Sequence, residues 1–402
     1  MVSRPRRPRK AIPPPALFKH PNLNLNPHYF LATAAQITYN PPQAACRACA
    51  RAASSHPYVN PQLYQLAKSA LFHLDPESAH SLTLAGLRVA ERLHLLSLVA
   101  GQPVSDPVTV MGLKFPNRVG LAAGMDKEAN TIAAFGHLGF GFVEVGTLTP
   151  RPQPGNPKPR LFRCIPQQAI INHMGINNPG IDRGVENIQA TKNFHGVLGV
   201  NISKNKVTPN AEANHDYVSC LRAAWDVADY VTVNFSCPNV PNLLELAQAD
   251  SAARLLSQLK SEQANLSTDT GRYVPLVMKV SPDMSERQIE ELCHVFLDCQ
   301  LDGLICTNTT TSREGVEDHP AAAESGGLSG KPLYNRANET LEAFAKGLRG
   351  EIPIIGTGGI FTAEDAVGKI RAGASLVQLY SGFIYNGPPL VQAAAAAIRD
   401  IR

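Results

Sequence analysis

The chain has 402 residues, of which 44% are hydrophobic and 17% charged, a composition ordinary for a globular protein with a large core. Its formal net charge of +4 is unevenly placed, because residues 1–74 hold nine Lys and Arg and no Asp or Glu. The basic character therefore belongs to the N-terminal region, and we expect no nucleic-acid partner. No run reaches the roughly 18 apolar residues that a membrane-spanning helix needs.

The first 57 residues form a basic leader without acidic residues, in which Ser and Ala are interspersed. This composition resembles that of an organelle transit peptide, although the prolines at 13–15 and 41–42 disfavour one long amphipathic helix. The alternative is a disordered tail that carries no address. We expect residues 1–57 to direct the protein to an organelle.

Residues 58–102 predict a helical hairpin. Apolar residues recur at helical spacing on both sides of Asp75-Pro76. Asp75 can cap the second helix, and Pro76 can take its first position. The second helical pattern breaks before Gly101-Gln102-Pro103. The hairpin therefore precedes a main domain over residues 103–402.

The main domain shows short apolar runs that end in Gly, Asn, Ser or Thr, with room for helices between most of them, such as 252–266 and 362–371. Apolar strands alternating with helices indicate a parallel sheet covered on both faces, and eight such units favour a closed (β/α)8 TIM barrel. An open α/β sheet is the alternative, but no G-x-G-x-x-G motif follows the first strand. The expected strands are Val119–Ala123, Phe142–Thr147, Leu198–Ser203, Tyr230–Phe235, Leu276–Val280, Gly303–Thr307, Pro353–Gly356 and Leu376–Tyr380.

Polar residues gather at the ends of these strands, where barrel enzymes hold their chemistry. Gly356, Gly358 and Gly359 after the seventh strand, with Ser381-Gly382 after the eighth, occupy the usual phosphate site of this fold. Glycines of tight turns without a ligand are the alternative. Few acidic residues and no paired histidines lie at the strand ends, so we expect no metal site.

Several long motifs resemble those of the dihydroorotate dehydrogenases, and the resemblance runs from about Tyr58 to Arg402. The hairpin, with Asp75–His80 at its turn, resembles that of the class 2 enzymes, which reduce a quinone at a membrane. The motifs are Leu121–Lys127, Gly146–Arg163, Ile171–Asn177, Val200–Lys206, Thr307–Thr310, Gly326–Leu333 and Leu376–Gly382.

The resemblance implies an FMN cofactor and the oxidation of dihydroorotate to orotate in pyrimidine (UMP) biosynthesis. Lys279 would stabilise the anionic reduced flavin, whereas a purely structural buried lysine is the costly alternative. The implied cofactor residues are Ala122, Ala123, Gly124, Met125, Asp126, Gly146, Thr147, Asn172, Asn201, Asn234, Lys279, Thr307, Gly330, Gly358, Gly359, Tyr380 and Ser381. The implied substrate residues are Lys127, Asn172, His173, Met174, Gly175, Ile176, Asn177, Asn234, Asn239, Asn308 and Thr309.

By position in the motif Asn234–Asn239, the catalytic base is Cys237. Class 2 enzymes normally carry a serine there, and a cysteine base is typical of the soluble class 1 enzymes. Val240 and Ile176 also depart from the class 2 pattern, which has threonine and phenylalanine at these positions. An unperturbed thiol has a pKa of about 8.5, so it needs less help than a serine hydroxyl to take a proton near neutral pH. A packing role for Cys237 is the alternative, and His173 is expected to be a wall residue.

The electron acceptor can be a quinone, as the hairpin indicates, or fumarate, as the cysteine motif suggests. We expect a ubiquinone-type acceptor that enters between the two helices, with its head near Lys158 and Tyr380. The amphipathic hairpin would rest on a membrane surface, and the class resemblance suggests a monomer at the mitochondrial inner membrane. A catalytically inactive, flavin-binding scaffold is the alternative from a different class of protein.

Overall fold

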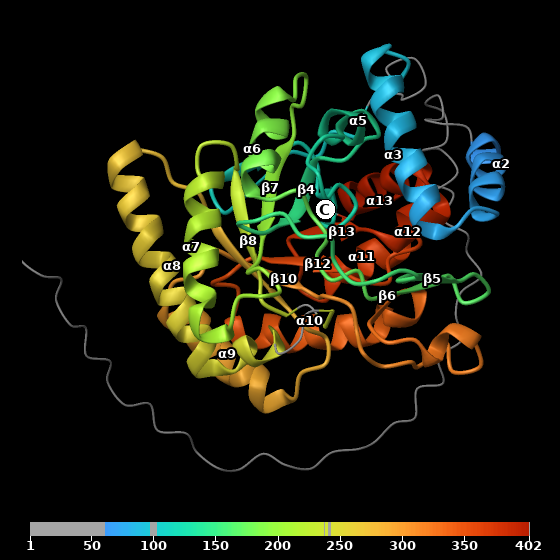
Figure 1. The fold of residues 1–402 in the computed structure, drawn as a ribbon. Helices are drawn as coiled ribbons and strands as arrows, with labels where there is room; N and C mark the ends of the chain where they lie inside the picture. The colour runs from blue at the N-terminus through green and yellow to red at the C-terminus, as the bar shows by residue number, and fades with distance from the viewer. Residues whose placement is uncertain (1–60, 97–102, 237, 240–242, 402) are drawn as a thin grey trace, which may run out of the picture. The chain divides into compact units, whose positions relative to one another are not determined.

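Eight parallel strands close into a barrel in which the spatial order follows the chain, as the sequence predicted (Figure 1). The computed structural model describes residues 61–96, 103–236, 238–239 and 243–401. Each strand overlaps an expected apolar run, with ends that differ by at most two residues. The barrel strands are β3 (Val119–Leu121), β4 (Phe142–Leu148), β7 (Val197–Ile202), β8 (Tyr230–Asn234), β9 (Leu276–Val280), β10 (Gly303–Cys306), β12 (Ile354–Thr357) and β13 (Leu376–Leu379).

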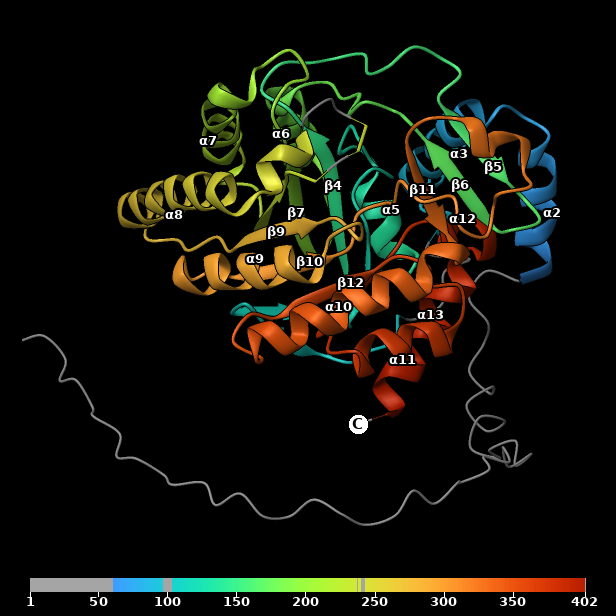
Figure 2. The same cartoon turned by 90° about the horizontal axis from the view of Figure 1, so that it is seen from below.

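Helices surround the barrel, and their ends follow local sequence signals (Figures 1 and 2). Capping boxes start two of them, Ser285 with Gln288 at α9 and Thr362 with Asp365 at α11. The helices are α5 (Ile132–His137), α6 (Ile181–Ala190), α7 (Ala213–Ala224), α8 (Ala249–Thr270), α9 (Glu286–Asp298), α10 (Tyr334–Leu348), α11 (Ala363–Arg371), α12 (Ser381–Asn386) and α13 (Pro388–Asp400). Short 3-10 helices span Asn210–Glu212, Leu243–Ala247, Pro320–Ala323 and Lys331–Leu333.

The predicted hairpin is present as α2 (Pro61–Phe72) and α3 (Pro76–Arg92). Asp75 caps α3, because its carboxylate accepts a hydrogen bond from the Ser78 backbone N–H at 2.9 Å. The Tyr64 hydroxyl of α2 donates to the carbonyl of Ile384 in α12 at 2.8 Å. The hairpin is thus attached to the segment that follows the last barrel strand.

Five further strands were not predicted from the sequence. β1 (Val108–Val110) and β2 (Leu113–Phe115) pair antiparallel, and β5 (Leu161–Cys164), β6 (Ala169–Asn172) and β11 (Gly327–Gly330) form a small antiparallel sheet. The small sheet lies beside the hairpin in Figure 2, and the Arg163 guanidinium donates to the Leu74 carbonyl at 2.9 Å. These strands have only three or four residues, too few for a clear alternating pattern.

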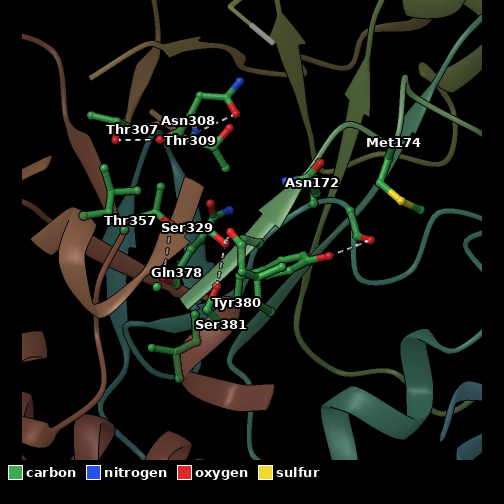
Figure 3. A pocket seen from close by; sticks show the side chains of 18 of the residues that line it. Asn172, Met174, Thr307, Asn308, Thr309, Ser329, Thr357, Gln378, Tyr380 and Ser381 are labelled. Carbon is green, nitrogen blue, oxygen red and sulfur yellow. Dashed lines mark hydrogen bonds between the residues drawn. The ribbon is translucent and has the colours of Figure 1, made fainter. Parts of the chain in front are cut away.

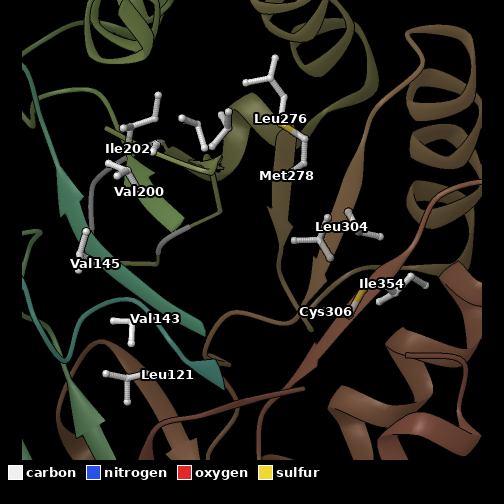
Figure 4. Packing of buried hydrophobic residues seen from close by; sticks show 14 of the residues in the cluster. Leu121, Val143, Val145, Val200, Ile202, Leu276, Met278, Leu304, Cys306 and Ile354 are labelled. Carbon is white, nitrogen blue, oxygen red and sulfur yellow. The ribbon is translucent and has the colours of Figure 1, made fainter. Parts of the chain in front are cut away.

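Apolar side chains cover both faces of the barrel wall. Alternate strand residues point outward against the helices, as Val143, Val145 and their neighbours do in Figure 4. The other face points into the barrel, where Phe115 of β2 packs with one residue from each of seven barrel strands. This apolar plug closes the end of the barrel at which the strands begin, and it leaves the carboxyl ends for a site.

Candidate active site at the barrel mouth

A cavity opens at the carboxyl ends of the barrel strands (Figure 3). Barrel strands and the loops that follow them supply most of its wall, and the small sheet and α3 supply the rest. The sequence-predicted residues that line it are Ala122, Ala123, Gly124, Lys127, Thr147, Asn172, Met174, Ile176, Asn177, Asn234, Asn239, Lys279, Thr307, Asn308, Thr309, Gly330, Gly358, Gly359, Tyr380 and Ser381.

One part of the cavity is made of glycine turns. Gly330, Gly358 and Gly359 have φ angles of +110°, +101° and +78°, a region that residues with side chains rarely adopt. A Cβ on Gly359 would also lie 2.4 Å from the Tyr334 Cα. The N–H groups of Gly358 and Gly359 donate to no backbone carbonyl of the described residues. Free amides at the ends of strands seven and eight of a barrel form a cradle for a phosphate.

Another part of the cavity carries side-chain amides from separate elements. The Asn239 amide donates to the Asn172 Oδ1 at 2.7 Å, and the Asn308 amide donates to the Asn234 Oδ1 at 3.2 Å. The Asn234 amide in turn donates to the Thr147 hydroxyl at 3.2 Å. Each amide offers both donors and an acceptor, so the group suits a planar ligand with ring N–H and C=O groups.

Lys127 brings a cation to the wall beside α3. Its ammonium donates to the Gly124 carbonyl at 2.6 Å, and burial, the largest cause, lowers its pKa to about 8. Burial, followed by the charge of Lys127, lowers the pKa of His80 to about 3, so this histidine is neutral near pH 7. An ammonium at a cavity wall can pair with the carboxylate of a ligand.

Lys279 supplies a second cation, on β9. Its side chain is 7% exposed and lines the cavity. The Ser236 hydroxyl donates to the Lys279 carbonyl and thereby ties the end of β8 to this strand. A buried ammonium next to a ligand stabilises negative charge that develops there, because little water screens it.

Three predicted cofactor residues have structural roles in the described structure. Met125 is packed in the core, and the carboxylate of Asp126 accepts hydrogen bonds from the backbone N–H groups of Asn130 and Thr131 at 3.1 and 2.7 Å. Gly146 has φ +94°, and its carbonyl accepts from the Gly124 N–H at 2.7 Å. None of the three lines the cavity.

Three further predicted residues do not line the cavity either. Asn201 is fully buried, and its Oδ1 accepts from the Thr147 hydroxyl at 2.6 Å. The His173 ring nitrogen Nδ1 is 3.0 Å from the Ser325 carbonyl oxygen, and a Cβ on Gly175 would lie 2.7 Å from the Asn156 side chain. The predicted base Cys237 and the neighbouring Val240 fall outside the described residues.

Ile176 lines the cavity in a strained backbone conformation. Its φ of +54° is unusual for a β-branched residue. Strain of this kind is concentrated at ligand sites, where the surrounding structure enforces it. Ile176 thus departs from the class 2 pattern in sequence and also has an unusual backbone conformation.

Several lining residues were not predicted from the sequence as site residues. Glu77 and His80 belong to the motif at the turn of the hairpin, and Gln378 is a single polar residue inside the apolar run of β13. A lone polar residue in a buried strand was an available signal for Gln378. Gly382, predicted at the phosphate site, also lines the cavity. The residues missed are Glu77, His80, Leu161, Ile170, Ser329, Leu333, Thr357, Ile360, Gln378 and Leu379.

Comparison with known proteins gives one consistent answer. A family model described as dihydroorotate dehydrogenase matches residues 107–401. A protein of Akkermansia muciniphila named dihydroorotate dehydrogenase (quinone) is 63% identical over 341 residues, covering 85% of this chain and 98% of that protein. A protein of the same name from Cellvibrio japonicus is 51% identical over 336 residues, which cover 84% of this chain and 98% of that protein. The structure of DHODH from Eimeria tenella in complex with ferulenol superimposes with a TM-score of 0.75 at 36% identity, covering 81% of this chain and 91% of that one.

The comparisons also bear on the expected location. The Akkermansia and Cellvibrio relatives come from bacteria, which gives no support to the mitochondrial placement expected from the class resemblance. Within residues 61–96, 103–236, 238–239 and 243–401, no helix is long and apolar enough to cross a membrane. The family match over the barrel and the near-complete coverage of the relatives lead to one conclusion: the chain belongs to the dihydroorotate dehydrogenase family, in its quinone-dependent class 2.

Proposed function

We propose that the protein uses FMN to oxidise dihydroorotate to orotate, a step of pyrimidine (UMP) biosynthesis, and passes the electrons to a ubiquinone-type acceptor. The observation that carries this proposal is that one cavity brings together a glycine cradle, two lysines and a set of side-chain amides. The relatives named dihydroorotate dehydrogenase (quinone) support the same substrate and acceptor.

The cavity fits FMN on three counts. The turns at Gly330, Gly358 and Gly359 leave room for a phosphate, and Lys279 offers a cation to the ring. The buried Oε1 of Gln378 accepts no hydrogen bond from a described residue, so it can receive a donor of a ligand. When bound, FMN would supply the redox chemistry, taking two electrons from the substrate and releasing them to the acceptor.

For dihydroorotate we propose that Lys127 pairs with the carboxylate and that the amides meet the ring. Asn177 and Asn239 each carry a buried Oδ1 without a partner among the described residues, which suits ring N–H donors. Asn172, linked to Asn239, and Asn308 complete the set. The ring would thus be held flat at the barrel mouth by groups from three loops.

For the proton step we propose Cys237 as the base that takes the proton from C5, while the hydride from C6 would pass to the bound flavin. The sequence carries this assignment, because Cys237 lies outside the described residues. Its neighbours in the motif support it, since Asn234 and Asn239 both line the cavity. Removal of the C5 proton and the C6 hydride leaves the C5–C6 double bond of orotate.

For the acceptor we propose entry along the hairpin. Glu77 and His80 of α3 line the same cavity as Tyr380, so the helix faces the reaction site. The Lys158 ammonium, expected near the quinone head, lies 3.3 Å from the Glu77 carboxylate. Most of the exposed large apolar side chains of the described residues belong to residues 61–96, namely Leu66, Leu74, Leu82, Val89, Leu93 and Leu95. Such a surface supports peripheral contact with a membrane, where a quinone resides.

We further propose the division of the chain that the sequence suggested, with a leader over residues 1–57, the hairpin over 58–102 and the barrel over 103–402. A monomer and a mitochondrial inner-membrane address remain proposals that rest on the class resemblance and on the composition of the leader. Fractionation of cells that express the full chain tests the mitochondrial location. Ultracentrifugation of the purified protein tests the monomer.

The proposed function is tested by adding dihydroorotate to the purified holoprotein without oxygen. The flavin absorbance is expected to bleach, and one orotate should form for each flavin. A flavin that stays oxidised would favour the inactive scaffold. A protein that bleaches and then reoxidises with fumarate but not with quinone would favour the soluble, fumarate-reducing alternative.

A further inference from the structure

A carboxylate lies buried inside the barrel, one layer below the cavity. Glu144 of β4 has no exposed surface. Its Oε1 accepts from the Asn201 amide at 2.7 Å, and its Oε2 accepts from the Gln378 amide at 2.8 Å and from the Tyr230 hydroxyl at 3.0 Å. Burial, followed by the charge of Glu144, raises the pKa of Tyr230 well above its ordinary value, so the tyrosine stays a donor.

One glycine leaves room for this arrangement. Gly199 pairs with Tyr230 in the neighbouring strand, and a Cβ there would lie 2.2 Å from the tyrosine ring. Gln378 and Glu144 meet across β3, which lies between β13 and β4. The hydrogen-bonded network therefore joins residues from β4, β7, β8 and β13.

The carboxylate decides which way the two amides face. Its two oxygens accept from the Asn201 and Gln378 amides, so each of these amides turns its N–H₂ group toward Glu144. The Oδ1 of Asn201 then points the other way and accepts from the Thr147 hydroxyl at 2.6 Å. The Oε1 of Gln378 also points away, and this buried atom has no partner among the described residues.

Gln378 is part of the cavity wall, together with Thr357 and Tyr380, as Figure 3 shows. A buried acceptor without a donor is unfavourable, so a ligand that donates to it binds more tightly. Thr357, the neighbour of Gln378 in β12, donates its hydroxyl to the Gln378 backbone carbonyl and so does not satisfy the side-chain acceptor.

We propose that Glu144 is a positioning residue of the cofactor site, which holds the Gln378 carbonyl oxygen toward the cavity as an acceptor for a donor of the flavin. The inference rests on the proposed use of FMN. Oxidised FMN has two kinds of donor that could reach such an atom, the single N–H of its ring and the hydroxyls of its ribityl chain.

The test is the affinity of the apoprotein for FMN, measured by quenching of FMN fluorescence. In Glu144→Gln the new amide needs an acceptor, and the Gln378 Oε1 has no partner among the described residues, so this carbonyl is expected to turn away from the cavity toward the new amide. The dissociation constant is expected to rise about tenfold or more. Gln378→Met, which keeps the length of the side chain and removes the acceptor, should show the same loss.

A rescue variant separates positioning from a general structural effect. In the exchange Glu144→Gln with Gln378→Glu, the new carboxylate accepts from residue 144 with one oxygen and presents the other to the cavity. Most of the lost affinity should return. Thr232→Val is the matched control, because Thr232 is fully buried in β8, between Tyr230 and Asn234, and is outside the network. This control should bind FMN as the unmodified protein does.

FMN methylated at the ring N–H identifies the donor. If Glu144→Gln no longer weakens binding when this analogue replaces FMN, the ring N–H is the donor. If the loss of affinity persists with the analogue, the donor is a ribityl hydroxyl. Unchanged FMN affinity in both single variants would overturn the proposal, as would an exchange variant that folds but shows no rescue. If Glu144→Gln does not fold, Gln378→Met alone decides. Failure of the unmodified apoprotein to bind FMN would instead contradict the proposed function.

Discussion

At the scale of single residues, the identity of the proton acceptor has the largest expected effect. Cys237→Ala is expected to slow flavin reduction by dihydroorotate at least 100-fold, the range of general-base catalysis. Cys237→Ser should shift the pH dependence of flavin reduction upward, because a hydroxyl gives up its proton less readily than a thiol. Anaerobic stopped-flow measurement of flavin bleaching checks both. Near-normal reduction in the alanine variant, or an unchanged pH profile in the serine variant, would remove Cys237 from this role.

The lowered pKa of Lys127 predicts a second pH effect, this time on substrate binding. Burial lowers its pKa to about 8, and only the ammonium form can pair with the carboxylate. The affinity for orotate should be constant below pH 8 and should fall about tenfold per pH unit above it. Spectral titration of the bound flavin with orotate measures this, and Lys127→Arg, which stays charged, should remove the decline. A decline that survives in the arginine variant would belong to another group.

The site was only partly predictable from single residues in the sequence. The glycines and polar residues at the strand ends marked the cavity, because barrel topology brings those ends together. Asp126 and Asn201 look the same in sequence as residues that line the wall, and only the packing shows that they face other partners. Glu144 was missed because nothing in a buried strand tells which polar neighbours meet it inside the barrel.

At the scale of elements, an ion pair holds the hairpin against the barrel. The Glu77 carboxylate accepts two hydrogen bonds from the Arg160 guanidinium, at 2.7 and 3.2 Å, and Arg160 is 6% exposed. Burial disfavours the charged carboxylate, but the hydrogen bond and charge of Arg160 outweigh it, so the pKa of Glu77 is lowered. Removing one partner leaves the other buried and uncompensated.

Glu77→Ala is therefore expected to loosen α3 and to lower turnover with a ubiquinone analogue about tenfold. Flavin reduction by dihydroorotate should change little, because Asn234, Asn239 and Asn308 of the proposed substrate site belong to the barrel strand β8 and to the loops after β8 and β10. Glu91→Ala, on the same helix, serves as the control. Measuring the two half-reactions separately checks the prediction, and an equal loss in both would mean that the ion pair supports the whole site.

Helix α11 carries a lysine that is expected to lower stability near neutral pH. Lys369 is fully buried, and its ammonium has no hydrogen-bond partner among the described residues. It faces the Tyr334 ring at 5.1 Å, with Cys306 and Asp365 nearby. Burial, the largest cause, lowers its pKa to about 7. Between pH 10 and 7 the unfolded chain holds a proton that the folded chain does not, so stability falls as the pH falls through this window.

Lys369→Met should remove this penalty. The free energy of unfolding is expected to rise on the order of 3–5 kcal/mol at pH 7 and to change little near pH 10. Denaturant unfolding at both pH values measures it. The same gain at both would point to better packing, and no gain at pH 7 would mean that the amine has a partner in solution.

The fold was more predictable than the site. Eight apolar runs became eight strands, and Asp75-Pro76 started a helix, because burial and capping are local properties of the sequence. The β1–β2 pair and the small sheet β5–β6–β11 were missed. Their strands are short, and their pairing joins residues as distant as Asn172 and Gly327, which local patterns cannot show.

At the scale of the whole molecule, the proposed function joins two reactions at one cavity. Dihydroorotate would be oxidised among the amides of the barrel mouth, and the acceptor would arrive along α3, whose Glu77 and His80 line the same space. The cysteine motif is a change within one loop, whereas the hairpin is built into the molecule through contacts with α12 and the β4–β5 loop. The hairpin should therefore determine the acceptor.

The most direct test of this claim is dihydroorotate-dependent turnover of the full-length holoprotein without oxygen, comparing a ubiquinone analogue with fumarate. We predict faster turnover with the quinone, which would make Cys237 a local substitution in a quinone-reducing enzyme. Turnover with fumarate alone would contradict the account, because the cysteine loop would then report the true acceptor and the hairpin would serve another purpose.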